Sequence, residues 1–227
     1  MTTSYLWFVP VTSLLWAFLY AFICKTNSKR SHEWNCRVVA MLHALLVTKL
    51  VEVLLVIGPW QFETFGDRNT LLQNVILVIS AGYFIFEIVW CLLMRTEGFI
   101  MLMHHVISVI SLIGGLINQY CGSEVTAVIW GSELTNPFLQ TRWFLREIKE
   151  YGSTFAKMND FIFFSLFAVV RIGIGTYMCV LVLSSEKTIL WMKIGGCLFQ
   201  SIGYIWMWQI ISFAKRRFVT QGKTTKS

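Results

Sequence analysis

Long apolar segments separated by short polar ones run through the whole chain. The apolar runs cover residues 5–24, 36–57, 71–94, 99–117, 124–146, 160–183 and 189–213. Most of them reach the ~20 residues that an α-helix needs to cross the hydrocarbon core of a bilayer. The segments between them are too short to hold a soluble domain. This pattern predicts an all-α fold, a multi-pass transmembrane helix bundle of about seven helices.

Composition supports a membrane protein, since 56% of the residues are hydrophobic and the mean hydropathy is +0.63. Lysine or arginine residues follow the first, third, fifth and seventh runs. The connections after the second, fourth and sixth runs contain only two basic residues, Arg68 and Lys187. By the positive-inside rule, we expect a lumenal or extracellular N-terminus and a cytosolic C-terminus. The net charge of +7 is then an orientation signal and a contact with acidic lipids, with no nucleic-acid partner. The six cysteines show no CxxC pairing and are interpreted as small hydrophobic residues.

Two adjacent histidines, His104 and His105, interrupt the fourth run near its start. Titratable rings in so apolar a segment carry a desolvation cost and therefore need partners. On a helix, positions 104, 108, 111 and 115 share one face and hold His, Ser, Ser and Gly. Ser108 is thus predicted to lie on the same polar stripe as His104, with His105 about 100° around the helix.

The second and third runs also contain polar groups. The second holds His43 and, further along, Lys49 and Glu52, which are three residues apart and are expected to neutralise one another. The third holds Glu87 near its cytosolic end. Because only four residues separate the third run from the histidine run, these two helices are predicted to be antiparallel neighbours.

The fifth run is the most polar. Glu133, Asn136 and Gln140 lie on one helical stripe, as expected for a helix that lines an interior. Pro137 lacks a backbone N–H and is predicted to bend the helix there.

Three arginines complete the candidate residues. Arg142 and Arg146, one turn apart, either extend to lipid phosphates or hold an anionic ligand. Arg171, near the middle of the sixth run, needs a carboxylate or a wet cavity, and Glu133 is the expected counter-ion if the two helices pack together.

These polar residues share one predicted depth. His43, Glu87, the histidine pair and Gln140 each lie five to seven residues from the cytosolic end of their helix, roughly 8–10 Å below the boundary. We therefore predict a common polar pocket that opens toward the cytosolic leaflet.

A histidine pair beside a carboxylate has a defined chemistry. One histidine acts as general base, or as a nucleophile that forms an acyl-imidazole, and Glu87 fixes its orientation. The structural alternative is a polar cluster that only packs the helices. Zinc on the paired histidines is disfavoured, because adjacent helical residues point ~100° apart. A di-iron desaturase site needs more than the four histidines present. Neither a metal nor a cofactor is predicted.

The same residues, in this order, resemble the TLC-domain family, a membrane fold shared by translocating-chain-associating membrane proteins, ceramide synthases and the Batten-disease cargo receptor. The resemblance runs from about Ser31 to Phe218. It includes His43, the string GYF followed by Glu87, the histidine pair, and SELTNPFLQTRWFL followed by RIG. Within the family, the strings WNCR, IGPWQF, RTEG and GSELTNPFLQTRWFLRE are similar to the TLC domain-containing protein 5 group.

The resemblance implies a six-helix TLC core preceded by one helix. The expected division is an N-terminal helix and linker (1–30), a TLC domain (31–218) and a basic tail (219–227), in an endoplasmic-reticulum or plasma membrane. Ceramide synthases use paired histidines and downstream aspartates to transfer an acyl group from acyl-CoA to a sphingoid amine. His104 and His105 match that pair, whereas this chain has Ser132-Glu133 and Asn136 at the downstream positions.

The leading hypothesis is a lipid-handling protein that binds or modifies an acyl lipid and influences membrane lipid composition. Acyl-CoA is the co-substrate in its enzymatic version. The alternative is a non-enzymatic lipid sensor, trafficking adaptor or transporter with a structural polar layer; enzymatic status and oligomeric state stay open. A tunnel of acyl-chain length would favour the first hypothesis, and a fully packed core the second. The candidate catalytic residues are His104, His105, Glu87 and Glu133, and the candidate lipid-binding residues are His43, Asn136, Gln140, Arg142, Arg171 and Ser108.

Overall fold

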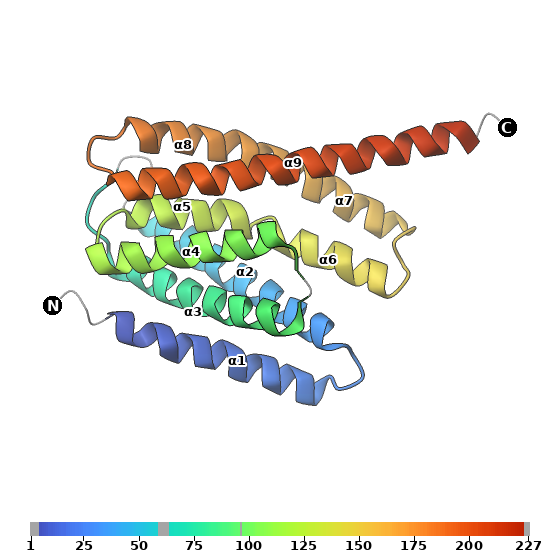
Figure 1. The fold of residues 1–227 in the computed structure, drawn as a ribbon, viewed down its shortest axis with the longest axis horizontal. Helices are drawn as coiled ribbons and strands as arrows, with labels where there is room; N and C mark the ends of the chain where they lie inside the picture. Colours follow the sequence, from blue (N-terminus) through green and yellow to red (C-terminus); the bar gives the residue numbers. More distant parts are fainter. Residues whose placement is uncertain (1–4, 59–63, 96, 225–227) are drawn as a thin grey trace.

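The computed structural model describes residues 5–58, 64–95 and 97–224. Figure 1 shows a bundle of helices that run roughly alongside one another. In chain order they are a 3-10 turn (Tyr5–Trp7), α1 (Phe8–Thr26), α2 (His32–Ile57), α3 (Leu71–Met94), α4 (Phe99–Asn118), α5 (Gly122–Glu133), α6 (Asn136–Glu147), α7 (Thr154–Leu166), a π-helical stretch (Phe167–Ile174), α8 (Gly175–Ser184) and α9 (Leu190–Thr224). The predicted all-α bundle of seven helices is confirmed, where α5 and α6 together correspond to one predicted helix, and α7, the π-helical stretch and α8 together correspond to another.

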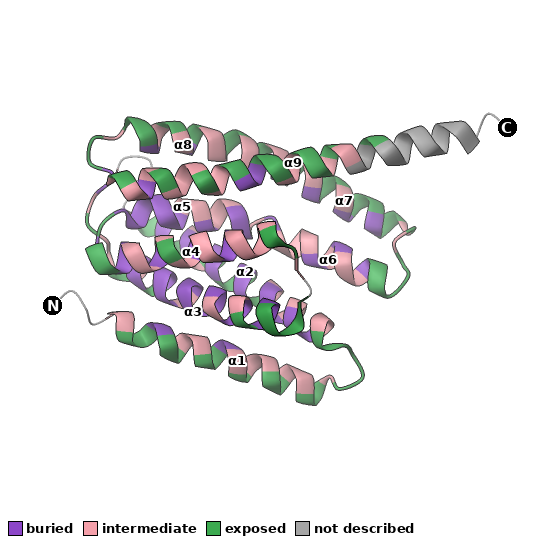
Figure 2. Ribbon diagram, viewed as in Figure 1, coloured by how far each residue is buried: buried purple, intermediate pink, exposed green. Residues whose placement is uncertain are grey.

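Several helices have the length and apolar surface of membrane spans. Five stretches are long and apolar enough to cross a bilayer: Tyr5–Thr26, His32–Ile57, Leu71–Met94, Phe99–Asn118 and Thr154–Ser184. Their outward faces carry exposed hydrophobic side chains, such as Phe18 at 71% and Val56 at 86% exposure, and Figure 2 shows buried residues concentrated on the inner helices. The chain is a multi-pass membrane protein.

Helices α3 and α4 form the predicted antiparallel hairpin. A capping box between Thr70 and Gln73 begins α3, and Arg95 ends it in the left-handed conformation, with φ of 54°. Gly98 precedes the first residue of α4; Thr96, in the connection, lies outside the described residues. This tight turn fixes the histidine pair of α4 against the Glu87 turn of α3.

Helix α1 lies at the edge of the bundle and is attached to α3 (Figure 1). Thr12 and Trp16 donate side-chain hydrogen bonds to the backbone carbonyls of Val78 and Ile79, at 3.1 and 3.2 Å. Gly82 allows this approach, because a Cβ atom there would collide with Thr12. The rest of α1 is largely exposed.

The fifth predicted run is broken into two short helices. Helix α5 ends at Glu133, α6 begins at Asn136, and Pro137 occupies its first turn. Proline is tolerated there because the first N–H groups of a helix have no internal acceptor. The predicted bend is confirmed as a break in the helix, and it places the Glu133 and Asn136 side chains at the centre of the bundle.

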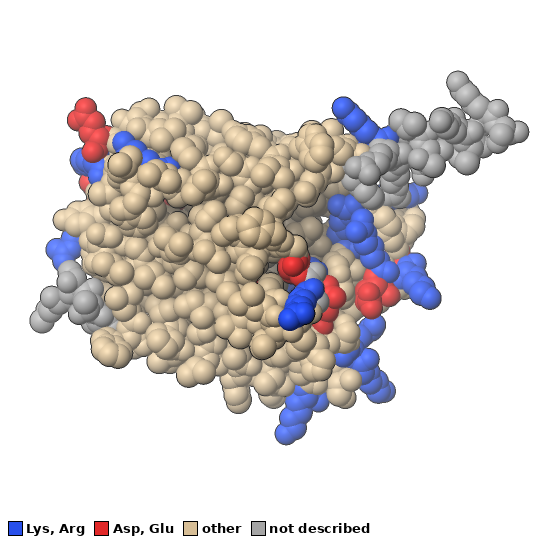
Figure 3. Space-filling model, in the orientation of Figure 1, with Lys and Arg blue, Asp and Glu red and all other residues tan. Residues whose placement is uncertain are grey.

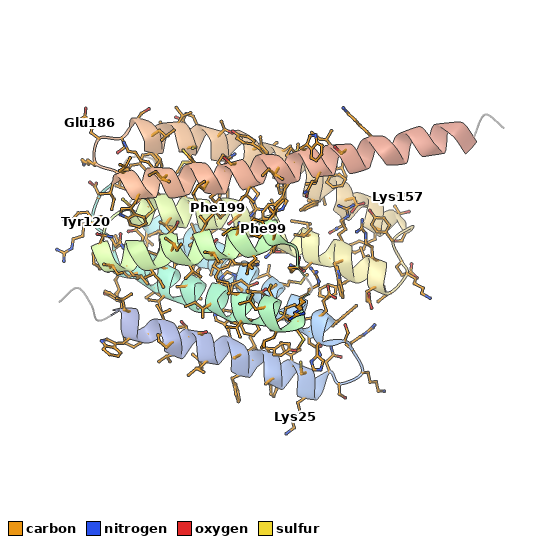
Figure 4. The ribbon with its side chains drawn as sticks, in the orientation of Figure 1. Lys25, Phe99, Tyr120, Lys157, Glu186 and Phe199 are labelled. Carbon is orange, nitrogen blue, oxygen red and sulfur yellow. The ribbon has the colours of Figure 1, made fainter. Side chains whose placement is uncertain are left out.

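The two ends of the bundle differ. The basic end carries the α1–α2, α3–α4 and α6–α7 connections, and the opposite end carries the α2–α3, α4–α5 and α8–α9 connections. Figure 4 labels Lys25 and Lys157 at the basic end and Tyr120 and Glu186 at the opposite one. Figure 3 shows charged side chains gathered at the basic end beside a hollow in the surface. The tail side chains from Arg216 onward lie outside the described residues.

Candidate functional site

A cavity of about 260 Å³ opens near the basic end of the bundle. Its walls come from α2, α3, α4, α5, α6, α7, the π-helical stretch and α9. Most of the candidate residues line it: Glu87, His104, His105, Glu133, Asn136, Gln140, Arg142 and Arg171. The structure therefore brings these side chains, from five separate elements, around one hollow.

The two histidines of α4 face different neighbours. The ring of His104 lies against Phe199 and Trp206 of α9, with ring centroids 4.8 and 5.0 Å apart. The ring of His105 lies 5.6 Å from Phe84 of α3. Both histidines are buried, and the Nδ1 atom of each has no hydrogen-bond partner among the described residues. Because adjacent residues of a helix point in different directions, His104 faces α9 and His105 faces α3.

Glu87 is bonded to neighbours other than the histidines. Its Oε1 atom accepts a hydrogen bond from Tyr83 at 2.9 Å and one from the Cys36 thiol at 3.6 Å. Its carboxylate and a ring nitrogen of His105 are within 4.8 Å of one another. The proposed orienting role of Glu87 has no direct hydrogen bond to a histidine in this structure and stays a prediction.

His43 stands behind the cavity wall and does not line the cavity. Its ring stacks on Tyr83, with centroids 3.7 Å apart and planes within 8°. Its Nδ1 atom lies 3.6 Å from Oε2 of Glu133. His43 therefore supports two residues of the cavity wall, Tyr83 and Glu133, and does not itself face the cavity where a lipid would bind.

The polar stripe of the fifth run forms a chain of side-chain contacts. Asn136 donates to Glu133 at 3.0 Å, and Gln140 donates to Asn136 at 2.9 Å. Gln140 also accepts from Arg37 of α2 at 3.2 Å. These hydrogen bonds connect Glu133, in the interior, to Arg37. We call the part of the cavity wall formed by Glu33, Arg37 and Glu97 its mouth.

Arg171 and Glu133 do not form the direct ion pair that the sequence suggested. The carboxylate of Glu133 is instead close to His43, because the stack on Tyr83 holds that ring against it. The guanidinium of Arg171 lies over the rings of Phe167 and Trp206, 5.3 and 5.1 Å from their centroids. The guanidinium is thus held by two aromatic rings, and Arg171 forms part of the cavity wall.

Arg142 is held inside the protein rather than in a lipid head-group position. It pairs with Asp160 of α7 at 3.2 Å and donates to the Tyr151 hydroxyl at 3.1 Å. Lys49 and Glu52, by contrast, form the expected pair within α2 at 2.6 Å.

Three residues at the mouth were missed by sequence reasoning. Arg37 bridges Glu33 of its own helix at 2.9 Å and Glu97 of the α3–α4 turn at 3.0 Å. Burial raises the pKa of the Glu97 carboxyl above its ordinary value, and Arg37 offsets part of that rise. The sequence shows Glu33 and Arg37 one helical turn apart, but Arg37 is also one of the basic residues after the first run that the positive-inside rule interprets as an orientation signal. Nothing in the sequence indicated its contact with Glu97.

A second, smaller cavity of about 70 Å³ lies beside the first. The two share Phe84 and Ser132 in their walls. The second is lined largely by apolar residues of α4, α5, α8 and α9, and Ser108 is on its wall. The Ser108 hydroxyl donates to the His104 carbonyl at 2.8 Å, which reduces its polarity toward the cavity.

One group of side chains has the composition of a metal site. Glu87, Cys91 and His105 are buried, and their ligand atoms lie within 4.8 Å of one another. They offer oxygen, sulfur and nitrogen donors, the set that suits zinc.

The family model of the TLC domain matches residues 33–212 of this chain. The matched region begins at the start of α2 and includes every candidate residue of the cavity, while α1 lies outside it.

Proposed function

Since this chain belongs to the TLC-domain family of membrane proteins, we propose that it binds an acyl lipid in the two adjacent cavities and thereby influences membrane lipid composition. The polar part of the lipid occupies the larger cavity beside His104 and Arg171. The acyl chain extends into the smaller cavity between α4, α5, α8 and α9. We further propose that the basic end faces the cytosol and that the protein resides in the endoplasmic reticulum or the plasma membrane.

The observation that carries this proposal is that a charged cavity and an apolar one lie side by side, with Phe84 and Ser132 in the walls of both. The larger cavity contains acids, amides, histidines and arginines, whereas the smaller one is lined mainly by side chains such as Leu112, Ile129 and Phe199. A lipid has the same division, with a polar head and an apolar chain. Ligand sites in membrane bundles are apolar hollows with a few placed polar groups.

The surroundings of His104 suit a lipid carbonyl or phosphate. Trp206 contacts both the His104 ring, at 5.0 Å, and the Arg171 guanidinium, at 5.1 Å. This aromatic ring therefore places a nitrogen base and a cation next to each other on the same wall. A carbonyl or phosphate oxygen there would meet a cation, and the acyl chain would continue past Phe199 toward the smaller cavity.

An acyl-CoA-dependent transfer is the enzymatic form of the same site. A nitrogen of His104 would attack the thioester carbonyl, the carbon–sulfur bond would break, and coenzyme A would leave as the thiolate. An amine or hydroxyl acceptor would then take the acyl group from the imidazole and release a proton. The position of His104 in the wall of the larger cavity favours this form.

The proposal is tested with a photoactivatable fatty acid added to cells that express the chain, followed by mass spectrometry of the labelled peptides. We expect labels on peptides of α4 and α9, loss of labelling in Gly196→Leu, and an altered cellular lipid profile relative to His104→Ala. Gly196 lines the smaller cavity, and a Cβ atom there meets open space, so leucine fills the hollow without strain.

Leu198→Phe is the matched control, because Leu198 is on the same helix but 50% exposed on the outer surface. Variants are compared at equal membrane abundance. Equal labelling of the wild type and Gly196→Leu, together with identical lipid profiles for the wild type and His104→Ala, would overturn the proposal.

A further inference from the structure

The side of the histidine pair that faces α3 contains chemistry that the lipid proposal does not use. Glu87 and Cys91 are one turn apart on α3, and His105 approaches them from α4. All three are buried, and their donor atoms lie within 4.8 Å of one another. This group joins the two arms of the α3–α4 hairpin.

The spacing suits a chelate. Residues four apart project from the same face of a helix, so the carboxylate of Glu87 and the thiol of Cys91 can reach the same ion. A tetrahedral zinc ion with bonds of ~2.0–2.3 Å has donor atoms ~3.3–3.8 Å apart. The donor atoms lie within 4.8 Å of one another, and the proposal requires that they approach further around the ion.

Glu87 is a buried carboxyl group without an ion-pair partner among the described residues. Glu87 is 8% exposed in a span of the membrane, and none of the ion pairs in the described part of the chain includes it. A buried carboxylate without a positive partner is unfavourable unless it is protonated or bound to a cation. Binding of a divalent ion would stabilise both this carboxylate and a Cys91 thiolate.

The neighbours of Glu87 resemble the outer shell of a metal site. The Tyr83 hydroxyl and the Cys36 thiol donate to its Oε1 atom, which orients the carboxylate. Such hydrogen bonds commonly fix the ligands of a metal ion. Glu87, His105 and Cys36 also line the larger cavity, which provides a path for an ion from the basic end.

We propose that Glu87, Cys91 and His105 bind a zinc ion that joins α3 to α4, with the fourth coordination position open to water from the cavity. This ion separates the roles of the paired histidines: His105 is a zinc ligand, and His104 remains free for the lipid. No metal was predicted from the sequence. The argument against zinc there concerned two adjacent rings, whereas this proposed site takes one ring and two residues of α3.

The test is metal analysis of the full chain purified in detergent after growth with added zinc. We expect near-stoichiometric zinc in the wild type and background zinc in Cys91→Ala and Glu87→Gln. Cys179→Ala is the control, because Cys179 is on α8 and away from the group. We also expect cobalt(II) to give the absorption band of a metal–thiolate bond in the wild type and not in Cys91→Ala.

A ligand replacement guards against simple misfolding. Cys91→His replaces the sulfur ligand with a nitrogen ligand on the same turn, so it should retain zinc while losing the thiolate band of the cobalt form. Background zinc in a folded wild type, or zinc content that Cys91→Ala leaves unchanged, would overturn the site. Fatty-acid labelling through His104 and the smaller cavity is read separately, so failure of the zinc site leaves the lipid proposal standing, and the reverse also holds.

Discussion

The two ends of the bundle treat buried polar groups in different ways. At the opposite end, amides satisfy one another: Asn69 donates to Asn74, Asn74 donates to Gln119, and Gln73 donates to Ser123, at 2.9, 2.9 and 3.0 Å. Near the basic end, charged groups surround a cavity of about 260 Å³, and the histidines retain unbonded nitrogens. Neutral groups with complete hydrogen bonds close a bundle, whereas charged groups with incomplete ones indicate a site for a ligand.

The contrast extends to Glu124, a buried acid at the opposite end. The Oε1 atom of Glu124 accepts from the Gly66 backbone N–H at 2.7 Å and from the Thr188 hydroxyl at 2.8 Å. These bonds connect the α2–α3 and α8–α9 connections to α5. The Oε1 atom of this buried acid thus serves closure of the bundle, and we expect its substitution to act on stability first.

The largest expected effect is on stability, from Asn74→Leu. This change leaves the Asn69 amide with only the Gly115 carbonyl as acceptor and the Oε1 atom of Gln119 without its donor. We expect a loss of about 1–3 kcal/mol in the free energy of unfolding, measured by thermal unfolding in detergent.

Asn118→Leu is the matched control for Asn74→Leu. Asn118 donates only to a backbone carbonyl of its own helix and is exposed. Its loss should stay within about 0.5 kcal/mol. Equal destabilisation by the two variants would contradict the view that the buried amides close this end.

The next effect tests whether the basic end can lose function without losing its fold. Glu133→Gln keeps the hydrogen bond with Asn136 but removes the charge beside His43. We expect near wild-type thermal stability with reduced fatty-acid labelling.

Glu133→Leu provides the comparison, because it removes both contacts and should cost about 1–3 kcal/mol. If Glu133→Gln unfolds as readily as Glu133→Leu, the cavity end is as structural as the closed end, and the contrast between them fails.

The sequence predicted the helices well, because hydropathy and helix length are local properties. The runs found by hydropathy correspond to the helices of the bundle, and Pro137 marks the break between α5 and α6. The common depth of Glu87, His104, His105 and Gln140 followed from counting residues along each helix, and all four line the larger cavity. Rise per residue gives depth without knowledge of packing.

The pairing of side chains could not be predicted in the same way. Depth does not fix rotation about the helix axis, so His43 could not be distinguished from a wall residue, although it stands behind Tyr83. The same uncertainty led to the expected pairing of Arg171 with Glu133. The contact of Arg37 with Glu97 joins residues 60 positions apart across a turn, and no local pattern encodes it.

A smaller effect is expected at the mouth of the cavity. Arg37 joins Glu33, Glu97 and Gln140, which restrains three elements around the opening. Arg37→Gln should change stability by less than about 1 kcal/mol per ion pair lost. It should speed modification of Cys36, which lines the cavity, by a membrane-impermeant maleimide, as quantified by peptide mass spectrometry.

Arg30→Gln is the control for the mouth, because Arg30 lies over the Trp34 ring and has no part in the Arg37 contacts. Cys36 modification in this variant should match the wild type. Unchanged Cys36 modification in Arg37→Gln would show that the arginine does not restrict access to the cavity.

The smallest expected effect is a pH dependence of the same opening. Burial raises the pKa of Glu97 in the folded state, so its carboxyl takes up a proton at a higher pH than in the unfolded chain. The contribution of this group to stability is therefore fully present below the unfolded pKa and is lost as pH rises through the folded pKa. Acidification should weaken the Arg37–Glu97 contact without unfolding the protein through this residue.

Glu97→Gln isolates that proton, because glutamine resembles the protonated acid at every pH. The ratio of Cys36 modification rates in the wild type and Glu97→Gln cancels the pH dependence of the thiol itself. We expect the ratio to be below one at neutral pH and to approach one as the pH falls and the wild-type carboxyl becomes protonated. A ratio that stays constant from neutral to mildly acid pH would show that the mouth is held by Glu33 and Gln140 alone, so that the charged end closes as firmly as the amide end.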